Sequence, residues 1–129
     1  ASHIIKNNSK IVTLATKIKD NKKIKDKNVV KVAISKNNNN YKAIFFSRAA
    51  IPYSSPSYYE HVGIYAYNIA MLEKFITLKQ GVLEKLESLE QLRALENNIK
   101  IDVSIIKKAP YSIDTPMDLK NYLNSIKNN

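Results

Sequence analysis

Short runs of apolar and β-branched residues alternate with polar segments along this chain, and the pattern predicts more strands than helices. β-Branched and aromatic side chains favour extended backbone because they pack well on a pleated, half-buried surface. The runs that predict strands are Lys10–Ile18, Val29–Ser35, Tyr41–Arg48, His61–Tyr67 and Ile99–Lys107.

Polar segments separate the first four of these runs. The lysine-rich segment after Lys10–Ile18 is expected to form a loop, and Asn37–Asn40 the solvated tip between the second and third strands. Ala49–Glu60 contains two prolines and a serine cluster, which break regular structure. We therefore expect that segment to be a mobile loop over a site.

Helical patterns follow in the second half of the chain. The sequence predicts a helix over about Asn68–Leu78 and a second, leucine-rich helix over about Val82–Asn97. Thr115 as N-cap and Pro116 at the first helical position predict a closing helix that runs to Ile126. Strands interleaved with helices favour an α/β domain in which helices flank a mixed sheet. At 129 residues, the chain is expected to form a single unit.

Composition narrows the class of protein. The chain has no cysteine, so we expect a reducing compartment, the cytoplasm. No apolar run approaches the roughly 20 residues that span a bilayer, so we expect no membrane partner. The formal net charge of +10 raises nucleic acid as an alternative partner. No aromatic platform or arginine fork accompanies the clustered lysines, so we interpret them as a solvated surface and expect no nucleic-acid partner. These lysines are Lys17, Lys19, Lys22, Lys23, Lys25, Lys27 and Lys31.

The predicted strand His61–Tyr67 has one polar face that could hold a ligand. Because side chains alternate along a strand, that face carries His61, Gly63, Tyr65 and Tyr67. Gly63 leaves space for a ligand between an imidazole and two phenols. The alternative is that the aromatic rings pack under a helix and that His61 is a buried histidine with satisfied hydrogen bonds.

Other candidate side chains are charged or polar. Arg48 ends a predicted strand, where its guanidinium could grip the carboxylate of an acidic ligand or form a structural ion pair. Glu90 and Arg93 share an arc of the leucine-rich helix at a spacing that permits them to pair or to meet a ligand. Gln91 could offer its amide to a hydroxyl. Asp114 lies just outside the closing helix, where no capping role needs it, so it is a candidate ligand for a hard cation such as Mg²⁺.

Five segments, taken in this order, carry a resemblance to a known family. They are KNVVKVAI, FFSRAAIPY, HVGIYAY, ESLEQLRAL and IDTPMDL. From about Ile11 to Leu123, the chain resembles the C-terminal portion of the 3-deoxy-manno-octulosonate cytidylyltransferases, also called CMP-Kdo synthetases. The last four segments match the FSRA-IP, HxGIYxY, LEQLR and VDTPEDL patterns of that family.

The resemblance implies an activity and a set of residue roles. The family transfers CMP from CTP to the acidic sugar Kdo for lipopolysaccharide biosynthesis, releases pyrophosphate, uses Mg²⁺ and forms homodimers. The roles that it implies here are contact with the sugar for His61, Tyr65, Glu90 and Gln91, a place in the same pocket for Arg48, and Mg²⁺ ligation for Asp114.

The chain departs from the family in one respect. Family members wrap the CTP phosphates with a glycine-bearing loop, and a chain with only Gly63 and Gly81 cannot build one. We therefore expect residues 1–129 to be a C-terminal sugar-binding and dimerisation portion that lacks the CTP-binding half and is inactive alone. Two alternatives stay open: a non-catalytic sugar-binding or dimerisation chain that works with a separate nucleotide-binding chain, and a cytidylyltransferase for another acidic sugar.

Overall fold

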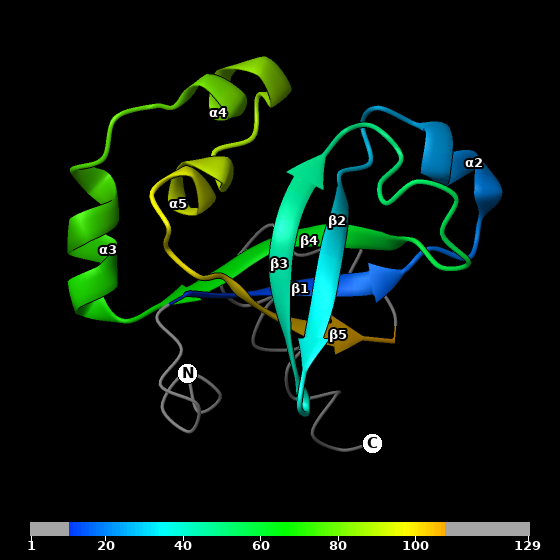
Figure 1. Cartoon of the computed structure of the whole chain (residues 1–129), viewed down its shortest axis with the longest axis horizontal. Helices are drawn as coiled ribbons and strands as arrows, with labels where there is room; N and C mark the ends of the chain where they lie inside the picture. The colour runs from blue at the N-terminus through cyan, green and yellow to red at the C-terminus, as the bar shows by residue number, and fades with distance from the viewer. Residues whose placement is uncertain (1–10, 108–129) are drawn as a thin grey trace, which may run out of the picture.

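The architecture is seen in a computed structural model that describes residues 11–107 (Figure 1). Five strands and four helices occupy this range. In chain order they are β1 (Ile11–Lys17), α2 (Asn21–Lys25), β2 (Lys31–Asn37), β3 (Asn40–Ser47), β4 (Tyr59–Tyr67), α3 (Ile69–Ile76), α4 (Val82–Glu87), α5 (Leu92–Glu96) and β5 (Asp102–Ile106). The predicted closing helix and Asp114 lie outside the described residues.

The five strands form one mixed sheet that closes into a barrel in the order β1-β4-β2-β3-β5. β1 lies between β4, which is antiparallel to it, and β5, which is parallel. β2 and β3 form an antiparallel hairpin that closes the barrel through short contacts: Lys31 pairs with Glu60 of β4, and Tyr41 and Lys42 pair with β5. The predicted mixed sheet with flanking helices is confirmed, and its closure is an addition that the strand pattern did not predict.

The core lies between the barrel and the helices α3 and α5. α3 buries Met71 and Phe75, which are four residues apart and therefore share one face of the helix. α5 buries Leu92 and Ala94. α3, α4 and α5 gather at one end of the barrel, whereas α2 lies at the other (Figure 1). No helix within residues 11–107 has the length and apolar character that crossing a membrane requires.

The lysine-rich segment differs from its prediction in two ways. A short helix, α2, forms where we expected a loop, because the Asp20 side chain caps it by accepting from the backbone N–H of Lys22 at 3.0 Å. Lys31 does not belong to the solvated surface, since its side chain is fully buried. Its ammonium donates to the backbone carbonyls of Asp26 and Val29 at 2.6 Å each and of Arg48 at 2.8 Å, which compensates for its burial.

The single helix predicted over Val82–Asn97 is wrong, because the chain breaks between α4 and α5. Ser88 caps α4 with a left-handed backbone at φ 57°, which a continuous helix does not permit. The Glu87 carboxylate accepts from the Ser47 hydroxyl at 2.8 Å and from the backbone N–H of Arg48 at 3.2 Å. These bonds to β3 hold the end of α4. We call residues 88–91 the corner.

Candidate functional site

Three aromatic rings of β4 lie in a row along one face of the strand. The centroid of the Tyr65 ring is 5.5 Å from that of His61 and 5.9 Å from that of Tyr67. Phe46 extends the row at the His61 end, at 4.8 Å and nearly edge-on, and Phe75 of α3 extends it beyond Tyr67, at 6.0 Å. The predicted placement of His61, Tyr65 and Tyr67 on one face of the strand is confirmed. The row also packs against helix α3 through Phe75, which agrees with the alternative that the rings pack under a helix.

Gly63 sits at an irregularity in the pairing of β1 with β4. Thr13 pairs with Tyr65, yet the next residue, Leu14, pairs with Val62, so β4 carries extra residues there. A Cβ atom built on Gly63 would meet no atom within 4 Å. Space is therefore open at Gly63 itself, and a ligand position between the imidazole and the two phenols stays a prediction.

His61 is a neutral hydrogen-bonding group. Burial lowers its pKa to about 4, so the ring carries no charge at neutral pH. Its Nε2 atom lies 2.8 Å from the Thr13 hydroxyl, and its Nδ1 atom lies 3.4 Å from the side-chain nitrogen of Gln91. Burial also raises the pKa of the neighbouring Tyr65, which therefore keeps its phenolic proton.

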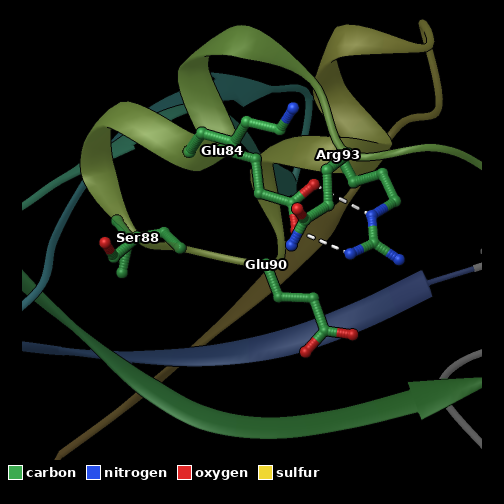
Figure 2. A pocket seen from close by; sticks show the side chains of 7 residues that line it. Glu84, Ser88, Glu90 and Arg93 are labelled. Atoms are coloured by element: carbon green, nitrogen blue, oxygen red, sulfur yellow. Dashed lines mark hydrogen bonds and ion pairs between the residues drawn. The ribbon is translucent and has the colours of Figure 1, made fainter.

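The corner brings Glu90 and Gln91 to this row of rings. Gln91 is buried and faces His61, whereas Glu90 is exposed. Burial first, and then the Glu90 charge, raise the pKa of Tyr67, and the same charge contributes to the raised pKa of Tyr65. Figure 2 shows the Glu90 carboxylate pointing from the corner toward β1 and β4. The structure thus assembles an imidazole, a phenol, an amide and a carboxylate.

A cavity of about 590 Å³ opens beside the corner (Figure 2). Glu90 belongs to its lining, so this residue connects the cavity to the row of rings. The full lining is Gln80, Glu84, Lys85, Ser88, Leu89, Glu90 and Arg93.

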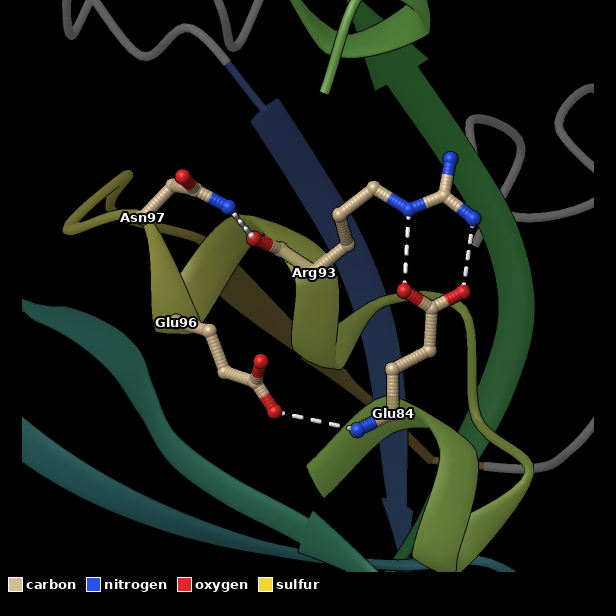
Figure 3. A network of polar contacts seen from close by, with 4 residues as sticks. All are labelled: Glu84, Arg93, Glu96 and Asn97. Carbon is tan, nitrogen blue, oxygen red and sulfur yellow. Dashed lines mark hydrogen bonds and ion pairs between the residues drawn. The ribbon is translucent and has the colours of Figure 1, made fainter. Parts of the chain in front are cut away.

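Arg93 pairs with Glu84 of α4 and not with Glu90, the partner that the i,i+3 spacing permitted (Figure 3). Its Nε and NH2 groups donate to the two Glu84 carboxylate oxygens at 2.9 and 2.6 Å. Glu96 of α5 accepts from the backbone N–H of Glu84 at 3.0 Å. The break at the corner lets α5 turn back against α4, and a bidentate, largely buried pair joins the two helices. The hydrogen bond to Arg93 lowers the pKa of Glu84.

Arg48 lies apart from the candidate sugar-binding side chains: among the described residues, no contact joins it to them. Its guanidinium donates to the backbone carbonyls of Glu87 at 2.9 Å, Lys27 at 3.1 Å and Ser88 at 3.3 Å. These acceptors include the last residue of α4 and the first residue of the corner. Arg48 therefore holds the corner that carries Glu90 and Gln91, and its direct contact with an acidic ligand stays a prediction.

The sequence reasoning missed Thr13, whose hydroxyl contacts His61. In the predicted strand Lys10–Ile18, Thr13 counts only as one of several β-branched residues that favour extended backbone. The available signal was a polar residue within the otherwise apolar run IVTLA, whose residues are largely buried in β1. No group of three or more acidic, histidine or cysteine side chains that could hold a metal ion occurs among residues 11–107. Mg²⁺ binding by Asp114 stays a prediction.

Comparison with known proteins identifies the family of this chain. The family model described as Cytidylyltransferase matches residues 1–101. The chain belongs to this cytidylyltransferase family.

Within the family, the chain is similar to 3-deoxy-manno-octulosonate cytidylyltransferases, as its motifs predicted. It is 45% identical to the one from Bartonella henselae over 111 residues, which is 85% of this chain and 46% of the relative. It is 46% identical to the one from Sinorhizobium medicae over 110 residues, which is 84% of this chain and 44% of the relative. The chain thus spans about half the length of the relatives that it matches.

A solved structure agrees with these relatives. The structure of CMP:2-keto-3-deoxy-manno-octonic acid synthetase complexed with CTP superposes with a TM-score of 0.78 at 28% sequence identity. The match covers 98% of this chain and 53% of that protein. The fold of this chain is therefore similar to that of about half of that synthetase.

Proposed function

We propose that this chain supplies the sugar-binding side of an enzyme that transfers CMP from CTP to Kdo, giving CMP-Kdo and pyrophosphate for lipopolysaccharide biosynthesis. Its similarity to 3-deoxy-manno-octulosonate cytidylyltransferases supports this proposal. One observation carries it: the Gln91 side chain from the corner meets the His61 ring of β4 beside Tyr65, and Glu90 of the same corner lines the neighbouring cavity. His61 and Tyr65 come from the strand, and Gln91 and Glu90 come from the corner.

The chemistry of this cluster suits a polyhydroxylated ligand. A neutral imidazole can accept a hydrogen bond from a hydroxyl, and a protonated phenol can donate one. The amide of Gln91 can do both, and the Glu90 carboxylate accepts strongly. Aromatic walls with a few convergent polar groups are typical of small-molecule sites. We therefore propose His61, Tyr65, Glu90 and Gln91 as the sugar-binding residues, with Arg48 supporting the corner.

The proposed reaction is a displacement at phosphorus. The anomeric hydroxyl of the sugar attacks the α-phosphorus of CTP, a new P–O bond forms, the bond to the β-phosphate bridge breaks, pyrophosphate leaves and the hydroxyl loses its proton. The residues of this chain contribute by holding the hydroxyl in line. Mg²⁺, the proposed cofactor, would neutralise the phosphate charge. Its proposed ligand, Asp114, lies outside the described residues, so we assign no step to it.

Calorimetric titration of the chain with Kdo tests the proposal. We expect Kdo to bind and Glu90→Gln to weaken binding by about tenfold or more, because a charge-assisted hydrogen bond is lost. Glu73→Gln on α3 makes the same change at another exposed carboxylate and should leave the affinity unchanged. Equal weakening by both variants, or no binding of Kdo, would contradict the assignment. Preference for a sialic-acid-type sugar would instead indicate a cytidylyltransferase for another acidic sugar.

The remaining half of the reaction requires a nucleotide site. We propose that residues 1–129 alone do not release pyrophosphate from CTP in the presence of Kdo, because no glycine-bearing phosphate loop can be built from them. A coupled pyrophosphate assay checks this. Turnover by the isolated chain at a rate typical of enzymes, about 1 per second or faster, would contradict it.

We propose that the chain forms a homodimer, and exposed apolar side chains support this. We also propose the cytoplasm as its location. Several large apolar residues of α3 and α4 face solvent, and such patches mark protein interfaces. They are Ile69, Leu72, Ile76, Val82, Leu83 and Leu86. Sedimentation analysis of Leu86→Glu should show a monomer where the parent chain is a dimer. Ile44→Glu on β3, a comparably exposed site, should leave the dimer intact.

A further inference from the structure

Thr13 occupies an unusual position at the irregular pairing between β1 and β4. Its side chain is almost fully buried, with 1% of its surface exposed. The hydroxyl lies 2.9 Å from the carbonyl oxygen of Ile64, 3.3 Å from that of Val62 and 2.8 Å from Nε2 of His61. Three polar atoms of β4 thus surround one hydroxyl.

The number of available protons decides how these atoms bond. A threonine hydroxyl has one proton and two lone pairs, and a carbonyl oxygen can only accept. If the hydroxyl gave its proton to Nε2, its oxygen would face the Ile64 carbonyl oxygen at 2.9 Å with no proton between them, so the proton goes to that carbonyl. What Thr13 presents to His61 is a lone pair, so Nε2 of His61 must carry a proton and donate it.

The other ring nitrogen follows from this bond. His61 is neutral near pH 7 because burial lowers its pKa to about 4. A neutral imidazole carries one ring proton, so Nδ1 holds a free lone pair once Nε2 is protonated. The side-chain nitrogen of Gln91, which is a donor, lies 3.4 Å from Nδ1, in agreement with this assignment. The long distance marks a weak contact that a better donor can replace.

We propose that Thr13 is a positioning residue, which fixes His61 in the Nε2–H form so that Nδ1 accepts a hydrogen bond from a ligand hydroxyl at the Gln91 side of the site. The edge-on ring of Phe46 and the ring of Tyr65 hold the plane of the imidazole, and Thr13 determines which nitrogen carries the proton. His61 consequently recognises a neutral donor, whereas the carboxylate of an acidic sugar must be bound elsewhere. The ligand part of this inference rests on the proposed function.

Nitrogen NMR of labelled histidine tests the tautomer directly. The spectra are recorded near pH 7 on His3→Gln, so that all signals come from His61, the one remaining histidine. We expect Nε2 to have the chemical shift of a protonated nitrogen and Nδ1 that of an unprotonated one. Thr13→Val removes the acceptor without changing the shape, and should shift the population toward the Nδ1–H form. Thr13→Ser keeps the hydroxyl and should restore the parent spectrum.

Thr16→Val is the matched control, because Thr16 is a second buried threonine of β1. It should leave the His61 signals unchanged. An Nδ1–H tautomer in the parent chain would overturn the proposal without any variant. An unchanged tautomer in Thr13→Val would overturn it as well, because Thr13 would then not set the proton position.

Titration with Kdo separates this inference from the proposed function. We expect Thr13→Val to weaken Kdo binding by about tenfold, the effect of one lost hydrogen bond, and Thr13→Ser to bind like the parent. If the tautomer changes as expected but the parent chain binds no Kdo, the proposed function fails and the role of Thr13 stands. If the parent binds Kdo and Thr13→Val binds it equally well despite a changed tautomer, the role of Nδ1 as acceptor is refuted.

Discussion

Acidification is expected to destabilise this chain through His61. The ring is buried between Phe46 and Tyr65, and its pKa is about 4 in the folded state against an ordinary value of 6.5. Because the folded-state pKa is the lower one, the unfolded chain binds more protons between these two values. The free energy of unfolding therefore falls as the pH falls through this window.

The two pKa values determine the size of the effect. The linkage relation gives a loss of about 2 kcal/mol between neutral pH and about pH 5, and of about 3 kcal/mol by about pH 4. Carboxylates add to the loss at the acidic end. The pKa of Glu84, for example, is lowered by its bond to Arg93, so its contribution is present above its ordinary value of 4.5 and disappears below it.

A comparison of variants isolates the histidine. Urea denaturation of the chain and of His61→Gln at a series of pH values measures how the difference between their free energies of unfolding changes with pH. We expect this difference to shrink by about 2 kcal/mol as the pH falls from neutral to about 5. His3→Gln, which removes the other histidine, should keep the pH dependence of the parent chain. A difference between chain and His61→Gln that does not change with pH would refute the burial argument.

Four further substitutions test the packing of α4, of the corner and of β4. Glu84→Gln should lower the free energy of unfolding by about 3 kcal/mol, because it leaves the largely buried Arg93 charge without its carboxylate; a loss below about 1 kcal/mol in urea denaturation would contradict this. Gly81→Ala should lower the free energy of unfolding by about 1 kcal/mol, because the new methyl group overlaps the Glu96 carboxylate of α5. Gly63→Ala meets no atom and should change the free energy of unfolding by less than about 0.5 kcal/mol. Equal losses at the two glycines would argue against that packing. Arg48→Lys should accelerate amide hydrogen exchange in the corner by about tenfold but leave exchange in β1 unchanged, because a lysine cannot reproduce three fixed bonds to carbonyls; slow exchange in both would contradict the bracing role.

The strands were predictable because their signal is local. Both ends of β1 and of β3 lie one residue from the predicted Lys10–Ile18 and Tyr41–Arg48, since β-branched and aromatic runs favour extended backbone whatever they pair with. The α4–α5 break was not predictable from periodicity. Leucines spread over Val82–Asn97 are compatible with one long helix, and Glu87 prefers the hydroxyl and backbone of β3 only because the fold brings that strand to it.

The candidate site, too, was only partly predictable from the sequence. Alternation along β4 was sufficient to place His61 and Tyr65 on one face, and the family motif pointed to Glu90 and Gln91. Neither pattern indicated that Gln91 would face the His61 ring or that Thr13 would hold the opposite nitrogen. Gln91 and His61 are 30 positions apart in the chain, and Thr13 and His61 are 48 positions apart. No repeat pattern encodes contacts over such separations.

The order of the strands, the polar face of β4 and the family motifs were therefore determined by the sequence alone, because each depends on neighbouring residues and on backbone geometry. Only the tertiary structure decided that the sheet closes into a barrel, that Lys31 is buried, that Arg93 pairs with Glu84, and that Arg48 braces the corner. The physical reason is that a buried charge takes whichever partner the packed fold places within reach, and that partner is selected by the whole chain.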